Sequence, residues 1–286
     1  SVNADPNPKG QGIVEYACDD FFPKQSFSSR EQKFEPGSYG ITEQPFKMTV
    51  DDNVRFSVTI FPTLKTSSPQ SLIEFGKFCL MLDPDGHVSF SFGSKAITTV
   101  DTISFRRWHR IEAQINKTGL MSIEFVNLDN SKGSKPASIQ FDLDLDLNEQ
   151  AHVIIAAKRV GGSAKNCFNG KIEHPEICAD GQIVAFWDFS ENIPSLAVTG
   201  VECPDLTLVN APTRAVTGAM WDASEMNWQH KPQHYAAIAF HEDDIYDFNW
   251  DADFSFVIPP KMPSGIYVMR ISCENDYDAI PFFVCP

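Results

Sequence analysis

Histidine and carboxylate side chains, the usual ligands of divalent metal ions, gather in one short stretch of the chain. These residues are His230, His234, His241, Glu242, Asp243 and Asp244. His230 and His234 are four residues apart, which would place them on one face of a helix, but Pro232 between them disfavours that helix. A histidine among aromatic residues is more often packed or solvated than bound to a metal. We therefore assign no metal ligands and keep His230, His234, His241, Asp243 and Asp244 as weak candidates.

Other catalytic patterns are equally incomplete. A Cys-His-Asp hydrolase needs a nucleophilic cysteine beside a base, and no cysteine of this chain stands in such a context. Gly161-Gly162-Ser163 has the composition of a turn and lacks the lysine of a phosphate-binding loop. The sequence therefore predicts no catalytic residues and no complete active site within the chain.

A run of alternating leucine and aspartate, residues 141–147, offers a possible calcium site. Its carboxylates Asp142, Asp144 and Asp146 are two apart, as in some calcium loops. The glycine and the distant glutamate of an EF-hand are missing, and leucine occupies every other position. We favour an amphipathic strand with its aspartates facing water.

The cysteine count indicates a reducing compartment. The seven cysteines are odd in number, irregularly spaced and without a Cys-x-x-Cys pair, so we expect buried free thiols and a cytoplasmic protein. The polar first ten residues do not resemble a signal peptide, and no apolar run is long enough to span a membrane. The chain begins at Ser1, which we interpret as a processed chain or a fragment.

Negative charge is concentrated in the second half of the chain. The net charge is −15; residues 167–286 hold 5 Lys and Arg against 18 Asp and Glu, and residues 1–166 hold the remaining 18 against 20. Nucleic acids and anionic membranes require a basic surface, so we expect neither as a partner. In the simpler interpretation, the excess negative charge serves solubility. In the other, the acidic part of the chain docks on a basic partner or tunes a neighbouring metal centre.

Apolar and polar residues alternate along much of the chain, which is the period of a strand with one wet face. Residues 54–60 alternate in this way, and residues 78–92 and 108–126 each predict a hairpin. No convincing amphipathic helix is present. We predict an all-β fold, with residues 36–190 in one two-sheet antiparallel sandwich that buries Trp108, Phe168, Ile172 and Phe186.

The composition changes after residue 200, where Trp221, Trp228 and Trp250 lie close together. Residues 253–259 and 266–271 read as two late strands of an immunoglobulin-like sandwich, with Pro-Ser-Gly at 263–265 as the turn before them. We therefore expect a β-sandwich with an N-terminal arm over residues 1–215 and a partial immunoglobulin-like module over residues 216–286.

Two local patterns resemble laminin-G-like, concanavalin-type sandwiches. One is Trp108-His109 at the start of a strand, and the other is Phe-Asn-Gly-Lys-Ile-Glu at 168–173 followed by Ile177. In the second pattern Gly170 would permit a close backbone approach while Phe168 and Ile172 pack inward. The family usually has aspartate where Glu173 stands.

Longer segments resemble the large subunit of N,N-dimethylformamidase. They are Ala-Asp-Pro-Asn-Pro-Lys-Gly at 4–10, Phe-Trp-Asp-Phe at 186–189, Asn-Ala-Pro-Thr-Arg-Ala-Val-Thr-Gly at 210–218, Trp228, Pro232, Tyr-Ala-Ala-Ile-Ala-Phe-His-Glu-Asp-Asp-Ile-Tyr-Asp at 235–247, Pro-Ser-Gly-Ile-Tyr at 263–267 and Ile-Pro-Phe-Phe-Val at 280–284. The resemblance implies an enzyme that hydrolyses small N-alkylated formamides with one iron held by tyrosines and a glutamate. Those ligands would follow Pro286, so this chain would be a non-catalytic scaffold portion without a cofactor of its own. Its partners would be the rest of the large subunit and a small subunit, in an oligomeric parent.

Two other functions stay open. A carbohydrate-binding, lectin-like module would use exposed Trp and Tyr to stack on sugar rings, although fold alone does not decide this. A glycosidase would need two carboxylates about 5–10 Å apart in a cleft, and no such signature is evident. A catalytic domain after Pro286 in the parent reading frame would favour the amide hydrolase.

Overall fold

The computed structural model describes residues 37–141, 145–193, 195–242, 256–274 and 276–284. These residues divide into two units, a large one over 37–242 and a small one over 256–284. The predicted domain boundary between 215 and 216 falls inside the strand Thr213–Val216, and the residues on both sides of it belong to the large unit.

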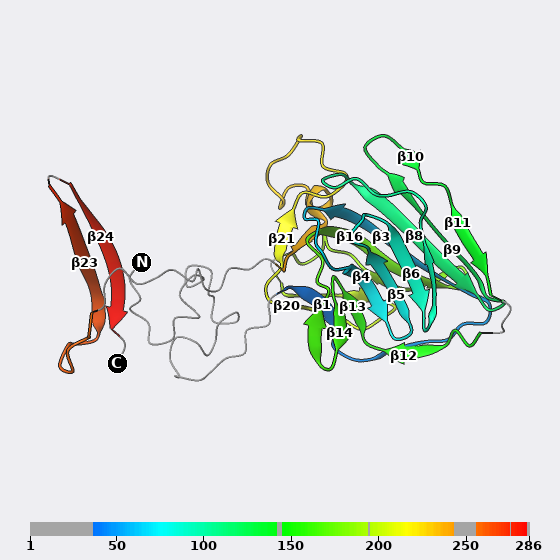
Figure 1. The fold of residues 1–286 in the computed structure, drawn as a ribbon, viewed down its shortest axis with the longest axis horizontal. Helices are drawn as coiled ribbons and strands as arrows, with labels where there is room; N and C mark the ends of the chain where they lie inside the picture. The colour runs from blue at the N-terminus through cyan, green and yellow to red at the C-terminus, as the bar shows by residue number, and fades with distance from the viewer. Residues whose placement is uncertain (1–36, 142–144, 194, 243–255, 275, 285–286) are drawn as a thin grey trace. The chain divides into compact units, whose positions relative to one another are not determined.

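The large unit is built from two antiparallel sheets that face each other (Figure 1). The first sheet has the order β18 (Ala197–Val198), β20 (Leu206–Val209), β1 (Tyr39–Thr42), β13 (Val153–Ile155), β4 (Gln70–Phe75), β5 (Phe78–Leu82), β6 (Val88–Phe92) and β7 (Lys95–Thr98). The second has the order β10 (Lys132–Gly133), β9 (Leu120–Asn127), β8 (His109–Asn116), β3 (Asn53–Pro62), β16 (Gly170–Ala179), β17 (Gln182–Trp187) and β19 (Gly200–Val201).

Shorter strands extend these sheets or lie beside them. In the second sheet β11 (Ala137–Gln140) pairs with β9, β22 (Ala237–Phe240) with β16, and β21 (Thr213–Val216) with β22. Two separate pairs are β2 (Phe46–Met48) with β12 (Glu149–Ala151), and β14 (Lys158–Val160) with β15 (Ser163–Lys165). Within the described residues the helical structure is one 3-10 turn, η2 (Pro232–Tyr235). The predicted all-β sandwich is confirmed.

Aromatic side chains from both sheets meet in the core. Phe56 of β3 lies 5.2 Å from Phe78 of β5 and 5.5 Å from Phe90 of β6, measured between ring centroids. All three side chains are fully buried. Alternation in β3 and β8 directs one row of apolar residues into this layer, as expected for a strand with one wet face.

The predicted core residues are half right. Phe168 and Ile172 are buried, but Trp108 and Phe186 are only partly buried, and their neighbours His109 and Trp187 occupy the interior instead. In β8 the odd-numbered residues Ile111, Ala113 and Ile115 point into the core. Trp108, with an even number and directly before β8, therefore lies on the outward side. Because side chains alternate with a period of two, choosing the wrong starting residue places the whole set on the wrong face.

Gly170 begins β16 where the backbone of β3 comes very close. It has a φ of +149°, and an added Cβ would overlap the carbonyl oxygen of Phe61 and lie 2.9 Å from Cα of Pro62. The close approach predicted at this glycine is therefore confirmed.

The leucine–aspartate run is not a strand in the part that can be examined. Residues 142–144 lie outside the described residues, and residues 145–148 pair with no other strand. Leu147 is buried and Asp146 is exposed, so the predicted alternation of inward leucine and outward aspartate holds without a hydrogen-bonded ladder. Residues 145–148 are instead held in place by Asn148, whose side chain donates to Asp146 and accepts from the backbone N–H of Val50.

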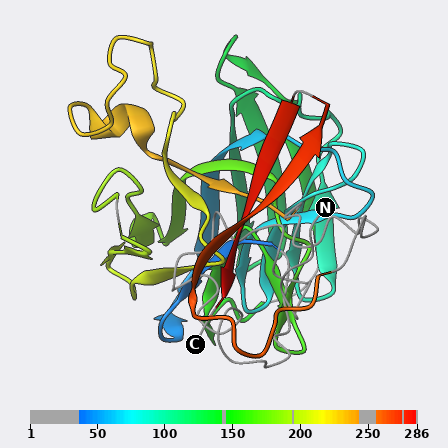
Figure 2. The same cartoon turned by 90° about the vertical axis from the view of Figure 1, so that its left-hand side faces the viewer.

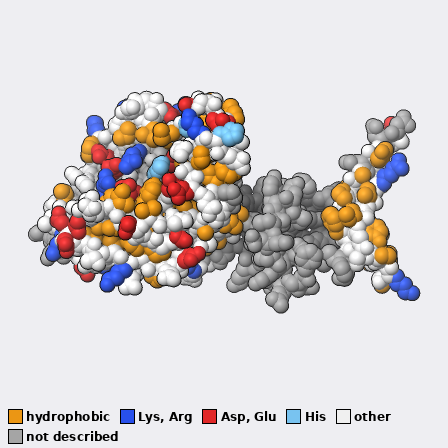
Figure 3. All heavy atoms as spheres, turned by 180° about the vertical axis from the view of Figure 1, so that it is seen from behind, with side chains coloured by type: hydrophobic (Ala, Val, Ile, Leu, Met, Phe, Trp, Pro, Cys, Tyr) orange, Lys and Arg blue, Asp and Glu red, His pale blue; other side chains and the backbone are white. Residues whose placement is uncertain are grey.

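The small unit is a hairpin of β23 (Gly265–Cys273) and β24 (Asp276–Val284). Apolar side chains cover much of its surface (Figure 3), among them the exposed Ile266, Val268 and Phe283. Residues 266–271 form a strand as predicted, whereas residues 256–259 do not, and 253–255 lie outside the described residues. The immunoglobulin-like character of this module stays a prediction.

Four cysteine side chains of the large unit form no disulfide bond: Cys79, Cys167, Cys178 and Cys203, of which the first three are buried. Burial raises the pKa of Cys79 and of Cys203 to about 11. The described residues form no apolar helix long enough to cross a bilayer.

Candidate functional site

The weak metal candidates that the structure describes, His230, His234 and His241, do not form a metal site. His230 is exposed with Nδ1 3.1 Å from Oε2 of Glu225, and His234 is buried with Nδ1 3.3 Å from Oδ1 of Asp222. His241 follows β22, where its backbone pairs with Ser38. Asp243 and Asp244 lie outside the described residues. Within the ranges that the structure covers, no three His, Cys, Asp or Glu side chains are grouped to hold a metal ion.

His230 and His234 instead belong to a long loop that connects β21 to β22, residues 217–236, here called the β21–β22 loop. This loop projects beyond the ends of the neighbouring strands (Figure 2). Gly218 donates its N–H to the backbone oxygen of His234 at 2.8 Å, which closes the base of the loop. The base is then attached to β16 by Lys171 and Glu173.

Glu173 is the most deeply buried carboxylate of this region, with an exposed fraction of 1%. Its Oε2 accepts a 2.7 Å hydrogen bond from the backbone N–H of Ala219, and its Oε1 lies 3.4 Å from Nε2 of His174. A buried carboxylate is tolerated when donors and cations surround it, and this one has both. The space beside it is filled too, since a Cβ on Gly218 would come within 2.9 Å of Oε1.

His174 has a strained backbone, with φ of +50° in the left-handed region that side chains other than glycine rarely adopt. Its ring stacks on Phe186 with centroids 6.0 Å apart. The hydrogen bond to Glu173 raises the pKa of His174, and burial opposes that change. The strain persists because the ring is held between an anion and an aromatic face.

Lys171 connects the sheet to the start of the loop. Its Nζ donates hydrogen bonds to Oγ1 and to the backbone oxygen of Thr217, at 2.8 and 3.0 Å. The ammonium also lies 5.4 Å from the ring centroid of Phe61 and 5.9 Å from that of Trp108. These are cation–π distances, so the ammonium of Lys171 lies against Phe61 and Trp108 on the outer face of the sheet. Burial lowers the pKa of Lys171, and the charge of Glu173 opposes the change.

The outer part of the loop is held by side chains that bond to nearby backbone N–H groups. Oδ1 of Asp222 accepts from Ser224, Oε1 of Glu225 from Asn227, and Tyr235 donates its hydroxyl to the backbone oxygen of Glu225. The bonds from Ser224 lower the pKa of Asp222 to about 2, and the backbone of Asn227 lowers that of Glu225. Both carboxylates are ionised at neutral pH.

The cluster of Lys171, Glu173, His174, Asp222 and His234 pairs acids with bases and fixes a loop in place. Thr217 is a hydroxyl residue in contact with the cluster, but it accepts a hydrogen bond from the Lys171 ammonium, which is not the arrangement of a nucleophile with its base. The sequence did not identify Glu173 as the residue that anchors the loop. It stands out there only because laminin-G-like sandwiches usually have aspartate at that position. Its partner Ala219 is 46 residues away, so no local pattern connects them.

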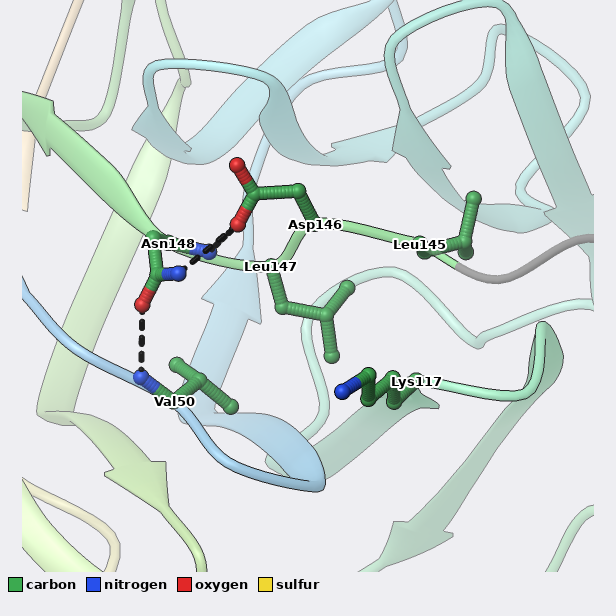
Figure 4. A pocket seen from close by; sticks show the side chains of 6 residues that line it. All are labelled: Val50, Lys117, Leu145, Asp146, Leu147 and Asn148. Atoms are coloured by element: carbon green, nitrogen blue, oxygen red, sulfur yellow. Dashed lines mark hydrogen bonds between the residues drawn. The ribbon is translucent and has the colours of Figure 1, made fainter.

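A cavity of about 250 Å³ lies elsewhere, beside the turn that follows residues 142–144. It is lined by Val50, Lys117, Leu145, Asp146, Leu147 and Asn148 (Figure 4). The Asn148 side chain donates to Oδ1 of Asp146 and accepts from the backbone N–H of Val50, which leaves the exposed Lys117 and the second carboxylate oxygen of Asp146 as polar groups of the lining. An exposed lysine and an exposed aspartate beside leucines do not define a ligand.

Among solved structures, similarity is loose. A carbohydrate-binding protein from Bacteroides ovatus matches with a TM-score of 0.42 and 9% identity, covering 65% of this chain and 64% of that one. The LG1-3 region of the laminin α2 chain matches with a TM-score of 0.37 and 18% identity, covering 50% and 31%. TM-scores this low carry no argument about fold or function, so the description of the fold rests on the sheets of this chain alone.

Sequence comparison is more informative. Residues 213–286 match the family model described as N,N-dimethylformamidase beta subunit-like, C-terminal. The N,N-dimethylformamidase beta subunits of Paracoccus aminophilus and of an Alcaligenes species are each 27% identical to this chain. Each alignment covers 100% of the chain and 44% of the relative, so the chain spans less than half of their length. Over its whole length the chain is thus similar to one part of the beta subunit of N,N-dimethylformamidase.

Proposed function

We propose that this chain is the non-catalytic portion of a larger, amide-hydrolysing subunit, and that it supports the assembly in which hydrolysis takes place. The observation that carries the proposal is the similarity to N,N-dimethylformamidase beta subunits along 100% of the chain. The substrates of the whole protein would be small N-alkylated formamides. Its partners would be the rest of the same large subunit and a small subunit.

The resemblance implies an iron held by tyrosines and a glutamate, and the residues at hand can be tested for that role. Glu173 is already committed to Ala219 and His174, and the hydroxyl of Tyr235 to the backbone of Glu225. Tyr267 donates its hydroxyl to Pro263. Glu173, Tyr235 and Tyr267 therefore do not fit the implied ligand set, and we derive no step through iron here. The proposal is that the ligands lie in sequence beyond Pro286.

The arrangement of the sandwich supports a structural role. The β21–β22 loop is held by hydrogen bonds to Glu173 and Lys171 of β16, and it lies within the residues that match the family model. A loop fixed in this way presents a defined surface to a neighbour without needing to move.

The test compares the full-length parent protein with residues 1–286 expressed alone. We expect dimethylamine release from N,N-dimethylformamide, and bound iron by elemental analysis, only with the parent. A circular dichroism spectrum typical of β-sheet would show that the shorter chain is folded and that its inactivity is meaningful. One tightly held iron per chain in residues 1–286, or amide hydrolysis by it, would contradict the proposal.

A further inference from the structure

The outer end of the β21–β22 loop, residues 220–227 and here called the loop tip, exposes large apolar side chains. Met220 is 68% exposed, Trp221 37% and Met226 74%. Single exposed apolar residues are common on protein surfaces, but three within seven positions of one loop are not. Methionine and tryptophan are also enriched where proteins contact each other.

The tip is rigidly held, although it reaches away from the sandwich (Figure 1). The two residues beside Met226 fix the backbone that follows them. The side chain of Glu225 accepts a hydrogen bond from the N–H of Asn227, and that of Asn227 accepts one from the N–H of Gln229. Trp221 donates its backbone N–H to Gly218, the residue at the base of the loop. A loop ordered before binding loses little conformational entropy on binding, so exposed side chains on it are effective contacts.

Charge indicates what kind of surface would receive the tip. Asp222 and Glu225 lie among the apolar residues, and the loop contains one lysine, Lys231, against these two carboxylates. In the large unit, which carries the loop, residues 167–242 hold 3 Lys and Arg against 10 Asp and Glu. Such a field attracts a basic surface and repels a second copy of this chain, whose net charge is −15.

We propose that the loop tip docks on a second polypeptide of the same enzyme assembly, in an apolar depression rimmed by Lys or Arg side chains. Met220 and Met226 enter the depression, and the carboxylates of Asp222 and Glu225 face its basic rim. This inference rests on the proposed function, because it takes the partner from the assembly proposed there.

A photo-cross-linking residue, p-benzoylphenylalanine, tests the contact in the full-length parent purified together with the polypeptides that copurify with its amidase activity. It replaces Met226 and, as the matched control, Val160, an apolar residue of β14 that is 54% exposed. We expect a cross-link from position 226 to a segment of another polypeptide that contains apolar and Lys or Arg residues, and little from position 160. The yield should fall as salt rises, because exposed charge contacts are screened.

Four results would overturn the inference: no cross-link from position 226, equal yields at 226 and 160, a cross-link to a second copy of the chain, or a partner segment without Lys or Arg. Amide hydrolysis by the same preparation is measured in parallel. An active assembly without the cross-link would defeat this inference and leave the proposed function standing.

Affinity provides an independent measurement once the partner segment is identified. The double variant Met220→Ser, Met226→Ser should weaken binding about tenfold or more, as expected for contacts at the centre of an interface. The matched variant Val100→Ser, Val160→Ser removes two exposed apolar side chains elsewhere and should leave affinity within about twofold. Similar affinities for the two variants would contradict the inference. Thermal unfolding of both variants confirms that the loop and the sandwich are intact.

Discussion

Oε2 of Glu173 accepts a 2.7 Å hydrogen bond from the backbone N–H of Ala219, and this contact ties a projecting loop to the central strands of the second sheet. The carboxylate is almost wholly buried and is also close to His174 and Lys171. The relationship explains how a loop that lies outside the sheet keeps one conformation. It also makes Glu173 the residue at which the structure of the loop is easiest to test.

Glu173→Ala should lower the free energy of unfolding by about 1–3 kcal/mol, because the amide of Ala219 and the side chain of Lys171 lose a buried partner. Glu173→Gln keeps an oxygen that can accept the bond from Ala219, so its loss should be smaller. Urea denaturation gives both values. Glu124→Ala, at an exposed position of β9, is the control and should change the free energy by less than about 0.5 kcal/mol. Equal losses for Glu173→Ala and Glu124→Ala would show that the buried contact is unimportant.

His174 should make stability depend on pH in one direction. Its pKa is raised in the folded protein by Glu173, with Asp188 adding to the effect and burial and Arg110 opposing it. The contribution is then complete below the unfolded pKa of about 6.5 and is lost as pH rises through the raised folded pKa. His174→Asn keeps a residue that tolerates positive φ but removes the charge. The difference in unfolding free energy between the wild type and this variant should shrink as pH rises above about 6.5, the unfolded pKa. A difference that stays constant with pH would contradict the assignment.

His109 should act in the opposite direction. It is buried, its Nδ1 is 3.0 Å from the backbone oxygen of Arg107, and its Nε2 is 3.3 Å from the N–H of Ser104. Burial lowers its pKa, so the neutral ring is favoured in the folded state. The stabilisation is present above the unfolded pKa of about 6.5 and is lost as pH falls below it. NMR titration should therefore show His109 taking up its proton at lower pH than His174, and the reverse order would refute both assignments.

Strand periodicity was sufficient to predict the sandwich, but it left the inward face of individual strands undetermined. Phe168 and Ile172 follow the pattern, whereas Trp108 and Phe186 face outward, where Lys171 and His174 stack on or near their rings. A large aromatic residue at the end of a strand is apolar enough that its residue type alone predicts a buried position, whether its side chain points inward or outward. The Glu173–Ala219 contact could not be predicted from sequence, because it joins positions 46 apart that no local spacing relates.

Gly170→Ala should destabilise the sandwich strongly, because the added Cβ would meet the carbonyl of Phe61 and Cα of Pro62. Gly93→Ala is the matched control: it also has positive φ, +57°, but its Cβ would meet no atom within 4 Å. We expect about 1 kcal/mol for Gly93→Ala from backbone strain alone, and several times more for Gly170→Ala. Similar midpoints in thermal unfolding for the two variants would mean that the strands β3 and β16 separate easily at this point.

The β23–β24 hairpin should be the least protected part of the described structure. It is a two-stranded sheet, and its exposed side chains include Ile266, Val268 and Phe283. Two strands alone rarely bury enough apolar surface to be stable, and both outer edges of such a sheet are open to water. Hydrogen exchange measured by mass spectrometry should therefore show the amides of residues 265–284 exchanging well before those of β3, β8 and β16. Addition of the remaining part of the parent subunit should slow the exchange of the hairpin more than that of the central strands, because β3, β8 and β16 already pair with a strand on each side. Uniform protection of both units in a dilute monomer would instead mean that the module is complete within residues 1–286.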